Sequence, residues 1–303
     1  MSKGSQIGIR KFAAIDIGSN AMRLLIVMVV ESGEQTDFKK VSLVRLPIRL
    51  GQEAFTGHKL KKSTVSKFLE GMKAFKIIMD IHEVEDYMAV ATSAMRETQN
   101  GEGIIRFIKN NTGLDINIID GKVEAEIIFK AHFRKSVYKD INYVYVDVGG
   151  GSTEITVLSG QKILDSKSFK IGTIRLMNDM VSKEKWKEMK EWVKKKTEEL
   201  EHVEMIGSGG NINKIYKLMN ATYPQPVLYH EFKAIKQTLS KMSYEQRIKS
   251  FQLNPDRADV IVPASDIYYS VMKWADSSIL HVPKIGLSDG IVQLLYERNK
   301  EMA

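Results

Sequence analysis

Cysteine is absent from the 303 residues of this chain. That absence excludes a disulfide framework, a thiolate zinc site, an iron–sulfur cluster and a cysteine nucleophile. Uninterrupted hydrophobic runs are also lacking, because the most apolar stretch, residues 12–30, contains Asp16, Asn20 and Arg23. A membrane-spanning helix does not usually carry an acid, an amide and a base. The sequence therefore predicts buried strands in this stretch, no membrane association and a cytoplasmic protein.

Metal-ligand spacing is missing among the six histidines, which lie far apart along the chain. Flexible linkers and low-complexity segments are lacking too. Hydrophobic residues at 43% and charged residues at 27% are ordinary for a globular protein. A length of 303 residues, at roughly 150 residues per domain, suggests two domains.

Positive charge is in excess, with 45 Lys and Arg against 37 Asp and Glu and a formal net charge of +8. A basic balance favours anionic partners such as nucleic acid, a membrane surface or a polyphosphorylated substrate. A protein that is basic without such a partner is the alternative. The lysine-rich segment 183–204 holds as many glutamates as lysines, so it predicts a solvated helix and no DNA-binding signature.

Apolar strands alternate with amphipathic helices along the chain, which favours an α/β architecture. A polar turn between the first two apolar runs predicts a hairpin. Ser63 is predicted to cap a helix whose apolar stripe ends at Met79. Strands are expected at residues 12–16, 24–30, 41–49, 87–91, 116–119, 143–146, 155–158 and 205–210. Further helices are expected from about residue 92 and at 123–135, 183–204, 211–219 and 288–298.

One strand–turn–strand pattern occurs twice. Asp16-Ile-Gly18 and Asp147-Val-Gly149 each join two apolar runs. A three-residue match alone could arise by chance, but the flanking runs match as well. The repeat predicts a duplicated domain, with two similar lobes that face each other.

Two turns have the composition of phosphate-binding loops. In the first, Asp16 ends a strand where it can bind a hydrated divalent cation, and Gly18 lets backbone amides approach a phosphate. The second turn contains three consecutive glycines, whereas a plain hairpin needs only one or two. Its predicted phosphate-binding residues are Gly149, Gly150, Gly151, Ser152 and Thr153. Asp147 and Glu154 flank them and are hard oxygen ligands suited to Mg²⁺.

A third glycine turn, Gly207-Ser-Gly209-Gly210, follows a strand and precedes a helix, which is a place for an anion. It is neither a P-loop nor a Gly-x-Gly-x-x-Gly loop, because Ile212 occupies the last glycine position. A strand-to-helix turn without a ligand is the alternative.

Arginines at the ends of predicted elements form a further anion-binding set. They are Arg23, Arg45, Arg49 and Arg96. Arg96 is predicted in the first turn of its helix, where the helix dipole and the guanidinium would face the same anion. For each arginine taken alone, a surface charge is the alternative.

Glu124 is the candidate general base. On a helix it shares a face with Ile127, Ile128 and Ala131 and should point inward, whereas Glu126 should point outward. An inward carboxylate between two phosphate-binding turns could activate water. An acid that only stabilises the helix dipole is the alternative.

Taken together, these motifs resemble the exopolyphosphatase / guanosine pentaphosphate phosphohydrolase family over essentially the whole chain. The segments that carry the resemblance are 12–20, 90–96, 121–125, 146–154, 207–210 and 255–260. The combination is specific within the wider actin-like, sugar kinase and heat-shock ATPase superfamily, where the two phosphate turns alone are shared.

The resemblance implies an α/β fold with two ribonuclease-H-like lobes of the actin-like ATPase superfamily and the active site in the cleft between them. It implies an N-terminal lobe at residues 1–122 and a second lobe at 123–287, with a final helix at about 288–303 that packs back on the first lobe. Family members usually form dimers, so a homodimer is expected.

Roles for individual residues also follow from the resemblance. Glu124 would activate water, and Glu154 would be the second essential acid, with Asp147 on Mg²⁺ or another divalent cation. Arg96 would hold the substrate chain. The residues that would cradle the terminal phosphates are Gly18, Ser19, Asn20 and 149–153.

The implied activity is Mg²⁺-dependent hydrolysis of the terminal phosphate of inorganic polyphosphate, with guanosine pentaphosphate as a second substrate. A kinase of the same superfamily and a non-catalytic polyphosphate or alarmone sensor are the alternatives. Longer members add a C-terminal helical region that this sequence does not contain, so short polyphosphate chains are the expected substrate. The family's Gly-Leu-Arg-Glu-Gly is Gly286-Leu-Ser-Asp-Gly290 here, which loses an arginine.

Overall fold

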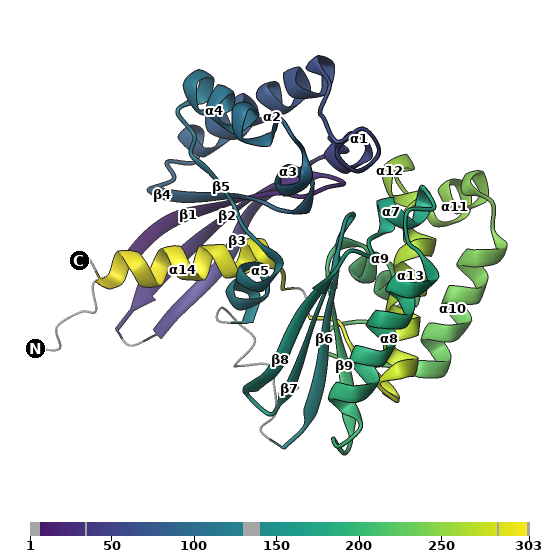
Figure 1. Cartoon of the computed structure of the whole chain (residues 1–303). Coiled ribbons are helices and arrows are strands. Elements are labelled where there is room, and N and C mark those ends of the chain that lie inside the picture. Colours follow the sequence, from purple (N-terminus) through teal and green to yellow (C-terminus); the bar gives the residue numbers. More distant parts are fainter. Residues whose placement is uncertain (1–6, 34, 130–139, 284, 302–303) are drawn as a thin grey trace, which may run out of the picture. The chain divides into compact units, whose positions relative to one another are not determined.

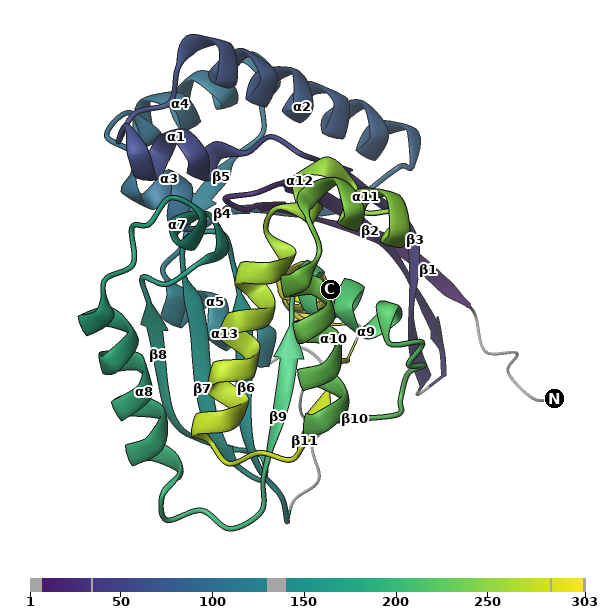
Figure 2. The same cartoon turned by 90° about the vertical axis from the view of Figure 1, so that its right-hand side faces the viewer.

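The computed structural model describes residues 7–33, 35–129, 140–283 and 285–301. Within these residues the chain forms two compact units. Unit 1 holds residues up to 120, residues 127–129 and the C-terminal helix, and unit 2 holds 121–126, 140–283 and 285–286. Each unit is built on one mixed β-sheet with helices (Figures 1 and 2).

The sheet of unit 1 has five strands in the order β3-β2-β1-β4-β5. They are β1 (Gly8–Ile17), β2 (Met22–Ser32), β3 (Gln35–Leu46), β4 (Asp86–Ala91) and β5 (Ile116–Ile118). β1 runs antiparallel to β2 and parallel to β4. Helices α2 and α4 lie on one face of this sheet and α14 on the other (Figure 1), so residues 12–17 of β1 and most of β2 are buried and mainly apolar. The helices are α1 (Leu50–Thr56), α2 (Lys62–Ile81), α3 (Ser93–Glu97), α4 (Gly101–Thr112) and α14 (Leu287–Glu301).

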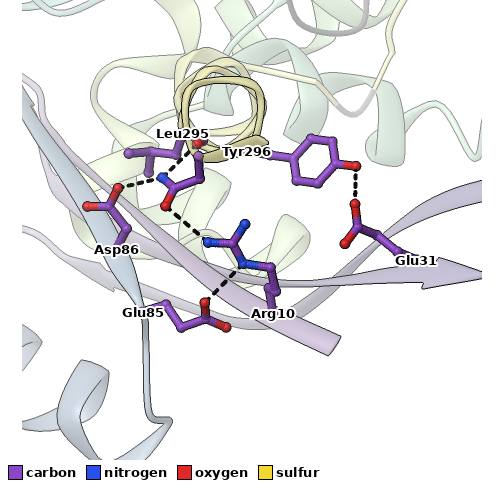
Figure 3. A network of polar contacts seen from close by, with 7 residues as sticks. Arg10, Glu31, Glu85, Asp86, Leu295 and Tyr296 are labelled. Carbon is purple, nitrogen blue, oxygen red and sulfur yellow. Dashed lines mark hydrogen bonds and ion pairs between the residues drawn. The ribbon is translucent and has the colours of Figure 1, made fainter. Parts of the chain in front are cut away.

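Helix α14 is anchored on β1, β2 and β4 by a polar network (Figure 3). Arg10 donates to Glu85 at 3.0 Å and to Asn299 at 3.0 Å, and Asn299 donates to Asp86 at 2.7 Å. At the other side of the helix the Tyr296 hydroxyl donates to Glu31 at 2.6 Å. Side chains of α14 thus form hydrogen bonds with polar side chains of β1, β2 and β4.

Unit 2 contains a six-stranded sheet in the order β10-β11-β9-β6-β7-β8. Its strands are β6 (Asn142–Val148), β7 (Thr153–Ser159), β8 (Lys162–Phe169), β9 (Val203–Ser208), β10 (Val227–Leu228) and β11 (Ile279–His281). Its helices are α7 (Thr173–Met177), α8 (Lys183–Thr197), α9 (Gly210–Leu218), α10 (Tyr229–Lys241), α11 (Tyr244–Phe251), α12 (Pro255–Ala258) and α13 (Ile261–Trp274). Helix α5 (Gly121–Ile128) begins in unit 2 and ends in unit 1. Helices α8, α10 and α13 cover one face of the sheet, over an apolar core (Figure 2).

The two sheets share one topology, as the sequence repeat predicted. The order β3-β2-β1-β4-β5 in unit 1 corresponds to β8-β7-β6-β9-β11 in unit 2, with the same parallel and antiparallel pairings. The first turns match in detail, because the Gly18 amide donates to the Ala21 carbonyl at 3.1 Å and the Gly149 amide to the Ser152 carbonyl at 2.9 Å. Unit 2 adds β10 at the edge of its sheet.

Several sequence-based boundaries differ from the structure. The strand expected at 41–49 is β3, which begins at Gln35 and ends at Leu46, and Arg49 caps a helix that was not predicted. The helix expected at 183–204 ends at Thr197, since the following residues turn and enter β9. Helix α2 is capped by Lys61 instead of Ser63.

The helix expected at 123–135 begins two residues earlier, at Gly121. Residues 130–135 lie outside the described part of the chain, and with them Ala131.

Candidate active site

A row of four polar residues crosses the sheet of unit 2. Asp147 on β6 is paired with Ser208 on β9 and with Glu154 on β7, and Glu154 is paired with Ser168 on β8. Residues paired in this way project from the same face of a sheet. Glu154 is 2% exposed, and the Ser168 hydroxyl donates to its Oε1 at 2.8 Å. Two carboxylates therefore lie side by side, Glu154 buried and Asp147 half-buried, where a cation would offset their repulsion.

The glycine turn that joins β6 to β7 has all three of its carbonyls occupied. The amides of Thr173 and Ile174 donate to the carbonyls of Gly149 and Gly150, and the Arg175 guanidinium donates to the Gly151 carbonyl at 2.8 Å. In a trans peptide the N–H points opposite to the C=O. The amides of residues 150–152 therefore point away from α7, as in a backbone nest for an anion.

Two residues that support this turn, Gly172 and Arg175, were not predicted from the sequence. A Cβ atom at Gly172 would lie 2.5 Å from backbone atoms of Gly150 and Gly151, so only glycine lets α7 approach the turn. Arg175 is 5% exposed although it is charged. The signal available in the sequence was a lone glycine and an arginine between a strand and an amphipathic helix, which is too common a pattern to be specific.

The hydroxyls next to this turn have different surroundings. Thr153 is fully buried and its hydroxyl donates to the Ile171 carbonyl at 2.6 Å. Its side chain thus stabilises the turn instead of offering the phosphate donor that the sequence predicted. Ser152 is also buried.

The turn between β9 and α9 is close to Asp147. Gly209 has a φ angle of +105°, and a Cβ atom there would lie 2.9 Å from Asp147 Oδ1. The Arg257 guanidinium donates to the Gly210 carbonyl at 2.6 Å, and the Asn213 side chain donates to the Gly209 carbonyl at 2.8 Å. The 255–260 segment that contributed to the family resemblance therefore stabilises this turn through Arg257.

The first turn of α5 lies against the carboxylate row. A Cβ atom at Gly121 would lie 2.7 Å from Ser168 Cβ and 3.2 Å from Glu154 Oε1, so a glycine is required at this position. Glu126 is exposed, as its predicted outward orientation requires, and Glu124 is half-buried.

Two buried tyrosines, Tyr145 and Tyr268, have pKa values that nearby carboxylates raise. Burial raises the pKa of Tyr145 well above its ordinary value, and the charges of Asp147 and Glu124 raise it further. Burial likewise raises the pKa of Tyr268, and the charges of Asp147 and Glu154 raise it further. Asp147 thus acts on both phenols, whereas Glu124 acts on Tyr145 and Glu154 on Tyr268. The sequence did not single out either tyrosine, because both lie in apolar runs typical of core.

Unit 1 carries a different row at the corresponding position. Asp16 on β1 is paired with Arg23 on β2, and Arg23 with Arg45 on β3. Asp16 is 5% exposed, and its Oδ2 accepts a hydrogen bond from Arg23 Nη1 at 2.7 Å. The structural equivalents in unit 2 are Asp147, Glu154 and Ser168, so the cationic row of one unit corresponds to the acidic row of the other.

The other predicted phosphate-binding residues of unit 1 are fixed by α1 and α3. The Ser19 hydroxyl shares a hydrogen bond of 2.9 Å with Ser93, and the Ser19 carbonyl accepts from the Gly51 amide. Arg96 lies in the last turn of the five-residue α3, and its guanidinium donates to the Ile119 carbonyl at 2.6 Å. Arg96 is the fourth residue of α3, so it lies in the predicted first turn, which in this short helix is also the last turn. Asn20 is partly buried in the turn that follows β1.

The predicted metal ligands Asp16, Asp147 and Glu154 belong to different units, and only Asp147 and Glu154 lie in the same one. Among the described residues no three His, Asp or Glu side chains form a cluster that could bind a metal ion by themselves. Over the same residues, no helix combines the length and apolar character needed to cross a membrane.

The shared topology defines the protein as an α/β member of the actin-like ATPase superfamily with two ribonuclease-H-like lobes. The family model of the Ppx/GppA phosphatase family matches residues 27–298. The chain therefore belongs to the Ppx/GppA phosphatase family.

Individual relatives agree with this assignment. The crystal structure of the Aquifex aeolicus member of the Ppx/GppA family superimposes with a TM-score of 0.76 at 26% identity, covering 98% of this chain and 100% of that one. A bifunctional 3-dehydroquinate synthase/phosphatase of Fusobacterium nucleatum is 31% identical over 289 residues, which are 86% of this chain and 43% of that protein. Exopolyphosphatase 2 of Mycobacterium tuberculosis is 29% identical over 178 residues, 56% of this chain and 54% of that protein. The chain thus matches only about half of the length of these two relatives.

Proposed function

We propose that this protein is a phosphoanhydride hydrolase that removes the terminal phosphate of inorganic polyphosphate, with the 5′-γ-phosphate of guanosine pentaphosphate as a second substrate. The observation that carries the proposal is the pairing of Asp147 with Glu154, against which the first turn of α5 with Glu124 lies, next to a glycine turn whose amides face away from α7. Similarity to a protein named exopolyphosphatase supports the choice of substrate.

In this mechanism Glu124 accepts a proton from water, and the water oxygen attacks the terminal phosphorus. The bond between that phosphorus and the bridging oxygen breaks, and the shortened chain leaves with the electron pair. The amides of residues 150–152 hold oxygens of the transferred phosphoryl group. Within unit 1, Arg23 and Arg45 lie side by side on β2 and β3 and are a separate candidate for binding an anion by charge.

Asp147 and Glu154 fit a divalent cation, because their paired carboxylates are hard ligands and their mutual repulsion needs a positive charge nearby. Mg²⁺ bound there would supply neutralisation of the charge on the phosphoryl group. In the absence of the metal, Ser168 still orients Glu154 through its hydrogen bond.

The test is release of orthophosphate in the presence of Mg²⁺ from tripolyphosphate, long-chain polyphosphate and guanosine pentaphosphate. Glu124→Gln should lower the rate by about 10²–10⁴-fold, the contribution expected of a general base. Glu126→Gln is the matched control, because it makes the same change two residues away on an exposed position of the same helix. This control should retain the wild-type rate.

Two results would refute the proposal. Equal rates for E124Q and wild type would remove Glu124 as the base. A wild-type protein that binds polyphosphate but releases no phosphate from any of the three substrates would be a binding protein, and the hydrolase assignment would be abandoned.

A further inference from the structure

Tyr268 on α13 forms hydrogen bonds at the starts of both glycine turns of unit 2. Its hydroxyl donates to the Ser208 carbonyl and accepts from the Val148 amide at 3.3 Å. Val148 directly precedes Gly149, and Ser208 directly precedes Gly209. One hydroxyl therefore joins the backbone of the two residues from which the turns depart.

The position of this hydroxyl in the sheet is also distinctive. Asp147 and Ser208 are the last paired residues of the β6–β9 ladder. Beyond them the two strands separate into their turns, and the Tyr268 hydroxyl bridges the backbone where that separation begins. Neither turn can shift relative to the other without changing one of its two hydrogen bonds.

The Tyr268 side chain has little freedom to move. It is fully buried, and a Cβ atom at Gly209 would lie 3.5 Å from its hydroxyl. Burial and the charge of Asp147 raise its pKa, so the hydroxyl keeps its proton and remains a donor at the pH of an ordinary assay. A tyrosine also loses little conformational entropy when it is fixed, because it has only two side-chain torsions.

We propose that Tyr268 is a positioning residue: it fixes the 149–151 turn and the 209–210 turn relative to each other, so that both hold the same terminal phosphoryl group. This inference rests on the proposed function and adds a residue that acts through the turns without touching the substrate. Loss of the Tyr268 hydroxyl should lower kcat more than it changes KM, because small displacements of backbone donors weaken transition-state binding.

The variant Tyr268→Phe removes the hydroxyl and keeps the ring. Tyr269→Phe is a matched control, because Tyr269 is the next residue of α13 and its hydroxyl accepts a hydrogen bond from Tyr229 at 2.8 Å, away from both turns. The two variants lose the same atom from adjacent positions. An effect that both variants show reflects a general loss of stability, and an effect that only Y268F shows reflects the loss of its hydrogen bonds to the turns.

Amide hydrogen exchange without substrate is the first measurement. Y268F should speed exchange about tenfold in peptides that cover 148–152 and 208–213, the effect expected from losing a buried hydrogen bond, and Y269F should not. Phosphate release is the second measurement. Y268F should lower kcat about tenfold and change KM less than about twofold, and Y269F should match the wild type.

Unchanged exchange at the turns in Y268F, or faster exchange with unchanged kcat, would overturn the positioning role. A wild-type protein without phosphatase activity would overturn the proposed function alone, since the exchange measurement would still decide whether Tyr268 fixes the turns. If Y268F does not fold, orthophosphate is added to the wild type instead. Both turns should then become protected together, and protection of only one turn or of neither would overturn the proposal.

Discussion

Gly209 shows how one residue can determine the distance between a carboxylate and a turn. Its φ angle of +105° is unfavourable for any residue with a side chain, and a Cβ atom there would also press on Asp147 Oδ1. Gly113 offers a comparison, because its φ angle is +74° and a Cβ atom there would meet nothing within 4 Å. The first glycine is required by conformation and by space, the second by conformation alone.

The substitution Gly209→Ala should therefore affect activity, and Gly113→Ala should not. G113A should lose about 1–2 kcal/mol of stability from its left-handed conformation, and G209A about 1–3 kcal/mol, because φ +105° and ψ 168° lie in a region essentially restricted to glycine. Only G209A should lose phosphate release, by about 10²-fold or more, because Asp147 must move. Urea unfolding and orthophosphate release measure the two effects. Wild-type activity in G209A would show that the position of Asp147 is not critical.

Single residues were predictable from the sequence where their own chemistry marks them. Consecutive glycines cost conformational entropy, so the 149–151 turn is recognisable from its composition alone. Tyr268 and Gly172 are not, because their importance comes from contacts with segments distant in sequence. A tyrosine in an apolar helix and a glycine after a strand have no local feature that distinguishes them from ordinary core and loop residues.

At the scale of elements, α14 depends on polar contacts as well as apolar ones. Asn299 bonds to Asp86, Arg10 and the Leu295 carbonyl, and it is partly buried. Arg298 also bonds to Asp86 at 2.8 Å, but its side chain is 51% exposed. The two neighbours thus bind the same carboxylate in different environments.

Asn299→Ala should destabilise the docking of α14 by about 1–3 kcal/mol, since it leaves part-buried partners unsatisfied. Arg298→Ala should cost less than about 1 kcal/mol, as for other exposed ion pairs. Hydrogen exchange of the α14 amides is the suitable measurement. Tryptophan fluorescence would follow the other unit, because all three tryptophans belong to unit 2 and α14 belongs to unit 1. Equal losses in the two variants would contradict this ranking.

The same contact predicts a pH dependence. Burial raises the pKa of Asp86, but hydrogen bonds from Asn299 and Arg298 outweigh burial and lower it below its ordinary value. A lowered pKa in the folded state stabilises the fold above the unfolded-state pKa, and this contribution disappears as the pH falls. The difference between wild type and N299A should be complete at neutral pH and shrink below about pH 4. A difference that grows on acidification would contradict the assignment to Asp86.

Element types followed from the sequence wherever periodicity was strong, as in α2, β1 and β7. Short elements and their ends did not. Helix α1 has seven residues, too few to show a helical period, and only residues 47–49 separate it from β3. The end of α8 was missed because charged residues continue past Thr197 while the chain already turns toward β9. Tertiary packing, which the sequence does not display, fixes these boundaries.

At the scale of the whole molecule, one topology serves two chemistries. The central row of unit 1 carries Asp16, Arg23 and Arg45, and the equivalent row of unit 2 carries Asp147, Glu154 and Ser168. The repeated turn preserved its backbone geometry in both copies, as the Gly18 and Gly149 hydrogen bonds show. The side chains next to that turn differ, with two arginines in the row of one copy and two carboxylates in the row of the other.

The net charge of +8 should favour the encounter with the proposed anionic substrate, which predicts a dependence on ionic strength. Electrostatic steering raises association rates by about 10–10³-fold at low salt, and salt screens it within about 10 Å at 0.1 M. The value of kcat/KM for long polyphosphate should therefore fall at least about tenfold, the lower end of the steering effect, between 20 mM and 500 mM salt. Tripolyphosphate, which carries fewer charges, should show a weaker fall. Circular dichroism at both salt concentrations controls for unfolding, and an equal response of the two substrates would exclude steering by the overall charge.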